Sequence, residues 1–337
     1  SVLRLTAYQI LYLDRIPPHA AVFEGVELVK HLGFSAWAPY VNAVSRRLLR
    51  EGVPPIVTDD SATALAETWS HPRWLVQRWL KHYGSQVTEQ LLRTNQDAAP
   101  LILRANTLLV SRDTVVTHWT NLGIDAYCGD APEAIIVRKA ADPKMLPGYA
   151  QGWFMVQDQS SQLVARALDP KPGDRVADLC SAPGGKTTHI AQLMENCGEI
   201  VALDVHPHRI RLLEATVARL GIGIVNAVSK DARQIPSDWY DSFDCVLVDA
   251  PCSGTGVLRR RVDARWRLRA QDITKMVRVQ RQLLAAAAKM VRPGGCLVYS
   301  TCSIEPEENT GMVGDFLARH GQFRRRDLRY LAVVAPR

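Results

Sequence analysis

Two cysteines lie in separate loops of a single predicted domain, of the kind that binds nucleotides. Each loop follows an apolar run typical of a buried strand. Cys252 stands in the segment DAPCSGTG and Cys302 in the segment YSTCSI. In parallel α/β sheets, ligands bind outside the carboxyl ends of the strands, so the sequence predicts both thiols on one rim. Two thiols beside a nucleotide-like cofactor indicate one chemistry, methyl transfer to C5 of a pyrimidine, because a thiolate is a strong nucleophile at neutral pH.

A third loop gives the same rim a candidate cofactor site. It reads DLCSAPGGKTT and departs from the GxGxxG pattern of NAD-binding loops. Its glycines allow a ligand to approach the backbone closely, and the helix predicted after them begins with free N–H groups. The predicted cofactor-binding residues of this loop are Cys180, Ser181, Ala182, Pro183, Gly184, Gly185 and Lys186.

Aspartates stand at the ends of four successive predicted strands, namely Asp178, Asp204, Asp231 and Asp249. Asp204 is suited to accept hydrogen bonds from ribose hydroxyls, and Asp231 is suited to bind an adenine amino group. Each aspartate alone could be a helix cap or a turn residue. Together they favour a cationic cofactor, S-adenosylmethionine, because carboxylates would repel a diphosphate. Arg209, at the start of the next predicted helix, is included in this predicted cofactor site.

The charge of the chain is concentrated in one stretch. The formal net charge is +7, and residues 256–292 hold eleven basic and two acidic residues. Because this stretch directly follows the Cys252 loop, it indicates a polyanionic partner beside the candidate site. The alternative is an ordinary solvated helix face.

The cysteines and the apolar runs exclude several classes of protein. No run approaches the ~20 apolar residues that span a membrane. The seven cysteines form no CxxC pair, no histidine cluster has metal-ligand spacing, and the odd cysteine count argues against a disulfide framework. A reducing cytosol and no metal site are therefore expected. Cys180, Cys245 and Cys296 are expected to be small buried apolar residues.

The first part of the chain predicts helices and then a small α/β unit. Residues 1–52 and 71–95 show only the helical spacing of apolar residues, and Trp79 is predicted to lie in a core. From Pro100 the pattern changes to short runs typical of strands, with one helix among them. These strands are predicted at 101–105, 107–110 and 135–137, and the helix at 114–122.

From Gln157 strands and helices alternate, which predicts a parallel, doubly wound sheet. The strands are predicted at 175–179, 200–203, 224–228, 244–248, 297–299 and 330–334, and the helices at 187–193, 207–220, 273–291 and 306–319. The first residues read as the middle of a helix, so a truncated N-terminus is expected. The short segment between Arg319 and Tyr330 suggests that a loop is missing there.

Three strings in the last part of the chain resemble signature motifs of the Fmu/Sun family of RNA cytosine-C5 methyltransferases. They are DLCSAPGGKT, LVDAPCSGTG and VYSTCSIEPEEN. The segments 4–12 and 15–22 resemble the NusB-like helical domain of the bacterial ribosomal small-subunit methyltransferase B branch, whose first half is expected to be absent here. The sequence departs from the family at Ala105, where the RNA-binding linker motif more usually has valine, and at Val262, where proline is expected.

The resemblance implies three domains. They are a partial NusB-like helical RNA-binding domain over residues 1–65, a small α/β linker domain, RRM-like and RNA-binding, over 66–152, and a Rossmann-like, S-adenosylmethionine-dependent methyltransferase domain with a mostly parallel sheet over 153–337. The first boundary falls in the polar stretch 58–63. The resemblance further implies a cytoplasmic monomer that acts on small-subunit (16S) rRNA, unassembled or partly assembled, without a membrane partner.

The resemblance also implies roles for single residues. In this family the Thr-Cys-Ser cysteine is the nucleophile and the Pro-Cys cysteine assists release, which assigns these roles to Cys302 and Cys252. Addition of a thiolate to C6 of cytosine makes C5 nucleophilic toward the sulfonium methyl group. DNA cytosine methyltransferases use the Pro-Cys cysteine instead, so the assignment depends on the second motif. Asp249 is expected to hydrogen-bond the cytosine N3/N4 edge, and Lys186 to neutralise the cofactor carboxylate or contact RNA.

Two alternatives stay open at this point. One is the same chemistry on tRNA or another RNA. The other is an RNA-binding ribosome-assembly factor without turnover, although a pure binder has no need of both thiols.

Overall fold

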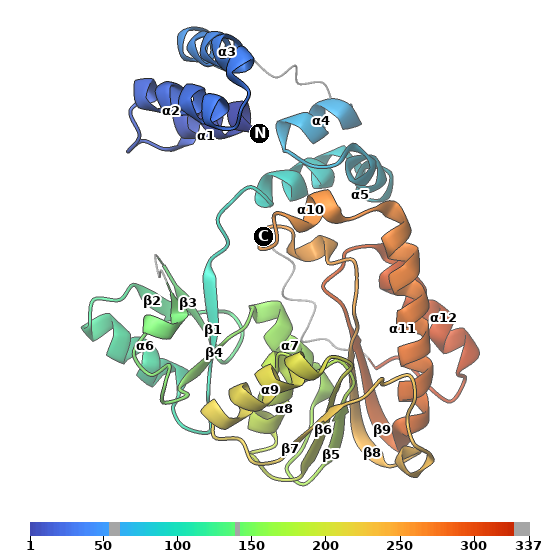
Figure 1. The fold of residues 1–337 in the computed structure, drawn as a ribbon. Helices are drawn as coiled ribbons and strands as arrows, with labels where there is room; N and C mark the ends of the chain where they lie inside the picture. Colours follow the sequence, from blue (N-terminus) through green and yellow to red (C-terminus); the bar gives the residue numbers. More distant parts are fainter. Residues whose placement is uncertain (54–60, 139–141, 327–337) are drawn as a thin grey trace. The chain divides into compact units, whose positions relative to one another are not determined.

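The computed structural model describes residues 1–53, 61–138 and 142–326, and its contacts divide the chain into two compact units, Ser1–Arg73 and Trp74–Arg337 (Figure 1). In the first unit, three helices pack on one another around a small core that includes Val29 and Val41. Its elements are α1 (Val2–Tyr12), α2 (Pro18–His31), the 3-10 turn η1 (Ser35–Trp37), α3 (Ala38–Glu51) and α4 (Ala62–Thr68). The predicted all-helical module is confirmed. Its predicted boundary at 58–63 lies partly outside the described residues.

The second unit begins with α5 (Arg73–Thr94), which bends at Gly84, where φ is 77°. A small domain follows, in which helix α6 covers a four-stranded antiparallel sheet of order β2-β3-β1-β4. Its elements are β1 (Leu101–Ala105), α6 (Arg112–Asn121), β2 (Ala126–Cys128), β3 (Ala134–Val137), the 3-10 turn η2 (Pro143–Met145) and β4 (Phe154–Val156). The predicted α/β unit is confirmed. The three-residue strands β2 and β4 are too short to show an alternating pattern in the sequence.

One predicted strand of the small domain is wrong. Residues 107–110 form a turn, in which the carbonyl oxygen of Asn106 accepts a hydrogen bond from the N–H group of Leu109 at 2.9 Å. The Asn106 side chain also hydrogen-bonds within this turn, and such local bonding competes with strand pairing. The helix that follows begins at Arg112, two residues earlier than predicted, because the Ser111 hydroxyl caps its first turn.

The core of the second unit is a five-stranded parallel sheet of order β7-β6-β5-β8-β9, which confirms the predicted doubly wound fold. The strands are β5 (Arg175–Asp178), β6 (Glu199–Asp204), β7 (Val225–Ser229), β8 (Phe243–Asp249) and β9 (Val291–Ser300). The register pairs Asp249 at the end of β8 with Ser300 at the end of β9. The two loops that carry Cys252 and Cys302 therefore leave the sheet side by side.

Helices cover both faces of this sheet (Figure 1). Side chains alternate along the strands, so that Ile200 and Leu247 enter a core with α7, α8 and α9, whereas Val201 and Val246 enter a core with α11 and α12. These helices are α7 (Gln159–Leu168), α8 (Gly185–Leu193), α9 (Pro207–Arg219), α11 (Ala270–Met290) and α12 (Thr310–Arg319), and shorter pieces are η3 (Ser237–Trp239), η4 (Thr255–Val257) and α10 (Ala264–Arg267).

The last part of the sheet domain differs from the prediction in two places. The predicted helix at 306–319 is broken into the 3-10 turn η5 (Pro306–Glu308) and α12, because the side-chain amide of Asn309 donates hydrogen bonds back into the preceding loop. Strand β9 begins at Val291, directly after α11, and includes the Pro-Gly-Gly segment that the sequence places before the strand. The predicted strand at 330–334 lies outside the described residues.

Candidate active site

Hydrogen bonds to the strands β5 and β6 hold the loop between β5 and α8 in place. The Thr187 hydroxyl donates to Asp178 Oδ2 at 2.7 Å, and the Ser181 hydroxyl and N–H group both donate to the carbonyl oxygen of Leu203 in β6. Burial raises the pKa of Asp178 to about 7. Asp178 and Ser181 thus support the loop from the core side, and Asp178 is the one aspartate of the four that is fully buried.

The glycines of this loop have distinct roles. Gly184 has a φ of +104°, and a Cβ atom there would lie 2.7 Å from Leu213 Cδ1. Only glycine fits this close approach without strain. Gly185 begins α8 and leaves the N-terminal N–H groups of that helix without intrahelical partners. Gly184 thus allows the loop to pack against α9, and the start of α8 offers N–H donors to a ligand.

Sequence reasoning missed a residue that supports the loop from the small domain. Arg104, on β1, is buried and donates hydrogen bonds to the carbonyl oxygen of Gly185 at 2.5 Å and to the Thr188 hydroxyl at 2.9 Å. Its Nη1 also donates to Gln157. Burial lowers the pKa of Arg104 to about 9. The one signal of this contact in the sequence is a charged residue, Arg104, inside the predicted apolar strand 101–105.

The remaining aspartates lie at the carboxyl ends of the strands, as predicted, but each already has a partner. Asp204 accepts hydrogen bonds from the N–H group of His206 at 2.9 Å and from Arg209 at 3.3 Å. Asp231 follows β7 and accepts hydrogen bonds from the backbone N–H group and the guanidinium group of Arg233, which lower the pKa of its carboxyl group. The Arg233 contacts favour the ionised form of the Asp231 carboxyl group.

Asp249 links the cofactor loop to the thiol loops. Its Oδ2 accepts a hydrogen bond from Lys186 Nζ at 2.6 Å, and its Oδ1 accepts one from the Ser300 hydroxyl at 2.7 Å. The predicted residues Lys186 and Asp249 are thus brought together as an ion pair in which the lysine is mostly buried. This pair holds the Asp249 carboxylate in one orientation beside both cysteine loops.

The two cysteines lie next to each other. Cys252 Sγ and Cys302 Sγ are 3.2 Å apart, and the N–H group of Gly256 donates to the carbonyl oxygen of Cys302 at 2.9 Å. A hydrogen bond from the Cys252 thiol lowers the pKa of Cys302 to about 7, and the charges of Arg261 and Lys186 act in the same direction. The same hydrogen bond raises the pKa of Cys252. The pair therefore divides into one thiolate and one thiol near neutral pH.

Helix α5, which precedes the small domain, braces the Cys302 loop. The Trp79 indole N–H donates to Glu305 Oε1 at 3.0 Å, and Arg78 forms ion pairs with Glu305 and Glu307. Both Trp79 and Glu305 are fully buried, which confirms Trp79 as a core residue. The sequence does not reveal that this core includes part of the Cys302 loop.

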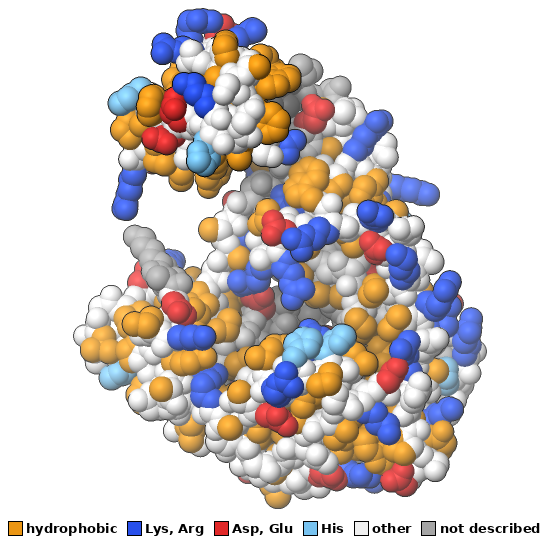
Figure 2. Space-filling view, in the orientation of Figure 1, with side chains coloured by type: hydrophobic (Ala, Val, Ile, Leu, Met, Phe, Trp, Pro, Cys, Tyr) orange, Lys and Arg blue, Asp and Glu red, His pale blue; other side chains and the backbone are white. Residues whose placement is uncertain are grey.

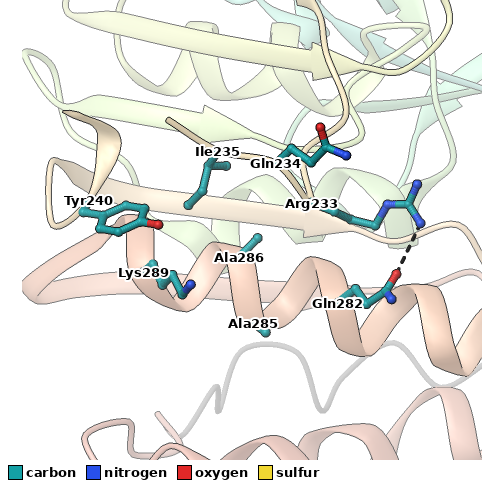
Figure 3. A pocket seen from close by; sticks show the side chains of 8 residues that line it. All are labelled: Arg233, Gln234, Ile235, Tyr240, Gln282, Ala285, Ala286 and Lys289. Carbon is teal, nitrogen blue, oxygen red and sulfur yellow. Dashed lines mark hydrogen bonds between the residues drawn. The ribbon is translucent and has the colours of Figure 1, made fainter. Parts of the chain in front are cut away.

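The described part of the second unit has at least two grooves on its surface. One, of about 690 Å³, adjoins the Cys252 loop and is lined by Ser253, Arg260, Arg261, Val262, Asp263, Ala264, Arg267, Leu268 and Asp272. The other, of about 550 Å³, lies between the segment after β7 and α11 and shares no residue with the thiol site (Figure 3). In that groove Arg233 donates a hydrogen bond to Gln282 at 3.2 Å, and Tyr240 lies beside Lys289.

Of the other cysteines, Cys245 is buried as predicted, whereas Cys180 and Cys296 are partly buried. Burial raises the pKa of all three thiols. Their protonated forms are therefore favoured near neutral pH. Among the described helices, none is both long and apolar enough to cross a membrane.

Comparisons with known proteins identify the domains. Residues 165–333 match the family model described as 16S rRNA methyltransferase RsmB/F, residues 71–143 match its ferredoxin-like domain, and residues 1–50 match the NusB family. The chain is 38% identical over 332 residues to the probable ribosomal RNA small subunit methyltransferase B of Bacillus subtilis, covering 96% of this chain and 73% of that protein. It is 36% identical over 321 residues to the ribosomal RNA small subunit methyltransferase B of Klebsiella pneumoniae, covering 93% of this chain and 71% of that protein.

Solved structures agree with these matches. The structure of PH0851 superimposes with a TM-score of 0.83 at 32% identity, covering 95% of this chain and 72% of that one. The structure of NSun6 from Pyrococcus horikoshii with SFG superimposes with a TM-score of 0.68 at 26% identity, covering 74% of this chain and 87% of that one. By its motifs, its fold and its relatives, the chain belongs to the RsmB/F family of 16S rRNA methyltransferases.

Proposed function

We propose that this protein transfers a methyl group from S-adenosylmethionine to C5 of a cytosine in small-subunit rRNA, through a transient bond between Cys302 and C6 of the base. The observation that carries the proposal is the pair of thiols 3.2 Å apart beside the Asp249 carboxylate. A nucleophile with a thiolate at neutral pH and a neighbouring thiol meets the two needs of this reaction, addition to C6 and later release.

S-adenosylmethionine is the cofactor of this methyltransferase, and the SFG ligand of the NSun6 relative is an analogue of it. The donor set fits this cofactor. The start of α8 offers backbone N–H donors, and the carboxylates of Asp204, Asp231 and Asp249 suit the ribose, the adenine amino group and a positive charge. When bound, the cofactor supplies an electrophilic methyl group.

The protein's own residues perform the remaining steps. The Cys302 thiolate forms a bond to C6, which shifts the ring electrons toward C5 and makes C5 the nucleophile. Asp249, oriented by Lys186 and Ser300, accepts a hydrogen bond from the N4 amino group of the cytosine. After C5 has been methylated, its proton leaves to solvent water and the electron pair of the C5–H bond forms the C5=C6 double bond. The C6–sulfur bond then breaks, Cys302 regains its thiolate, and Cys252, beside the leaving sulfur, assists this release.

The groove beside the Cys252 loop suits the phosphates that flank the target base. Its wall carries Arg260, Arg261 and Arg267, and Figure 2 shows Lys and Arg side chains gathered over the side of the molecule that carries α11. Arg260 already pairs with Asp158, which leaves Arg261 and Arg267 as the stronger candidates for RNA contacts. This supports the expectation that the basic stretch 256–292 binds a polyanion.

The experiment that tests this proposal measures transfer of the tritiated methyl group of S-adenosylmethionine to 16S rRNA and, in parallel, to tRNA. Nucleosides from the digested RNA are then separated. We expect labelled 5-methylcytidine from rRNA. Label in tRNA alone would show that the protein methylates tRNA and not rRNA. Absence of label from both RNAs would favour an RNA-binding protein without methyltransferase activity.

Asp204→Ala is expected to weaken S-adenosylmethionine binding. Loss of a charged hydrogen-bond acceptor typically costs about 1–3 kcal/mol, or roughly a 5- to 140-fold rise in Kd. Titration calorimetry measures this directly, with the exposed Asp238→Ala as a matched control that should bind normally. An unchanged Kd for S-adenosylmethionine would show that Asp204 does not bind the cofactor.

The rate of methyl transfer is expected to rise as the pH increases through about 7. The pKa of Cys302 is lowered to about 7, so its reactive thiolate is lost as the pH falls below that value. Between pH 6 and pH 8 the thiolate fraction should rise roughly tenfold. Single-turnover rates at constant ionic strength check this, and an inflection near the ordinary thiol value of about 8.5 would contradict it.

A chain that begins near residue 66 is expected to bind S-adenosylmethionine normally but to methylate rRNA poorly. Every candidate site residue lies in the second unit, whose cores are separate from the core of the first helices. We propose that residues 1–65 serve RNA targeting, and a tenfold or greater rise in KM for rRNA corresponds to about 1.4 kcal/mol of lost binding. If the shortened and the unshortened protein methylate rRNA equally well, residues 1–65 do not serve RNA targeting.

We further propose that the protein acts as a cytoplasmic monomer on rRNA that is unassembled or partly assembled. All seven cysteines are free, which suits a reducing compartment. We likewise propose that the three domains meet at residues 65 and 152.

A further inference from the structure

Both cysteines of the candidate site are followed by a serine, and the two serines bind the same buried carboxylate. Ser253 follows Cys252, Ser303 follows Cys302, and both hydroxyls donate to Oε2 of Glu308. The two serine oxygens are themselves 3.0 Å apart. One carboxylate thus joins the loop after β8 to the loop after β9, one residue away from each thiol.

The other oxygen of Glu308 is also fully used. Oε1 accepts the N–H group of Ser253 at 2.9 Å and the side-chain amide of Gln280, on α11, at 2.9 Å. The same amide donates to the carbonyl oxygen of Pro251 at 2.9 Å. Because all four hydrogen bonds of the carboxylate go to the protein, Glu308 has no acceptor left for substrate.

Glu308 is fully buried, and no lysine, arginine or histidine in the described part of the chain forms an ion pair with it. Burying a carboxylate without a cation is costly unless hydrogen bonds compensate for lost water. Here every compensating donor beyond Gln280 comes from the two thiol loops. The loops must therefore keep their present separation for the carboxylate to remain satisfied.

We propose that Glu308 is a positioning residue that holds the Cys252 and Cys302 loops in register, so that the two sulfur atoms stay in contact. This inference rests on the proposed function for its catalytic meaning. A shift of about 1 Å in a reacting group can cost on the order of a hundredfold in rate, so loss of this carboxylate should lower kcat more than it changes any affinity.

The test is Glu308→Gln, whose amide keeps the volume but cannot accept two hydroxyl donors and two N–H donors. Diamide oxidises a pair of thiols in contact to a disulfide and takes up both electrons and both protons as its hydrazine. The rate of Cys252–Cys302 disulfide formation, followed by peptide mapping, therefore reports the sulfur contact without RNA. We expect this rate to fall roughly tenfold or more, kcat to fall on the order of a hundredfold, and the Kd for S-adenosylmethionine to stay within about twofold.

A second readout is the pH profile of Cys302 alkylation by iodoacetamide. In the unaltered protein the inflection should lie near 7, and in Glu308→Gln it should move toward the ordinary thiol value of about 8.5, because Cys252 no longer donates to Cys302. The matched control is Asp315→Asn on α12, whose exposed carboxylate pairs with Arg281. This control should leave both thiol measurements unchanged.

Ser253→Ala and Ser303→Ala remove one donor each and provide the same test if Glu308→Gln does not fold. Slower disulfide formation in either variant supports the inference. Unchanged oxidation and alkylation in all three variants would overturn it. Failure of the proposed function shows separately, as absence of 5-methylcytidine in rRNA treated with the unaltered protein, because the thiol measurements use no RNA.

Discussion

Cys302→Ala is expected to abolish methyl transfer to rRNA while leaving S-adenosylmethionine binding intact. The free energy barrier rises because C5 of cytosine is a poor nucleophile until a thiolate has added to C6. Removal of a catalytic nucleophile typically costs roughly 10⁴-fold or more in kcat. Alanine removes the sulfur but disturbs little else, since the Cys302 carbonyl oxygen still accepts the N–H group of Gly256. Transfer of tritiated methyl groups measures the loss, and calorimetry measures the retained cofactor affinity.

The control for this variant is Cys197→Ala, which removes an exposed thiol outside the candidate site. It should methylate rRNA at the normal rate. Near-normal turnover of Cys302→Ala would show that the proposed nucleophile is wrong.

Cys252→Ala is expected to fail at a later step. Cys302 can still add to C6 and the methyl group can still transfer, but release should stall because Cys252 no longer assists it. A protein–RNA complex that survives denaturing electrophoresis should then accumulate. The hydrogen bond between the two sulfurs also disappears, which should raise the pKa of Cys302 and slow the addition without preventing it.

The double variant Cys252→Ala/Cys302→Ala separates the two roles. It should give no covalent complex, since it lacks the attacking sulfur. A complex trapped by Cys302→Ala instead of Cys252→Ala would reverse the assignment and correspond to the arrangement of the DNA cytosine methyltransferases.

The sequence predicts those parts of the site that lie at strand ends. Asp204 and Asp249 close strands whose continuous apolar runs are plain, and the parallel register then places the Cys252 and Cys302 loops together. It does not predict the contacts that side chains make across the fold. Two such contacts are the hydrogen bond from Arg104 to Gly185 and the hydrogen bond from Ser253 to Glu308. Both depend on the packing of elements far apart in the chain, which local sequence patterns do not reveal. The turn at 107–110 was similarly hidden, because Asn106 overrides an apolar run.

The bond from Trp79 to Glu305 has a consequence for the synthesis of the chain, because it joins residues 226 positions apart. Ribosomes add about 5–20 residues per second, so roughly 11–45 s pass between the translation of α5 and that of its partner loop. During this interval the indole of Trp79 lacks its final packing. The Cys302 loop, in turn, packs against a helix that was translated long before it. The newly made protein therefore acquires its reactive thiol only when nearly all of the sequence present here has been translated.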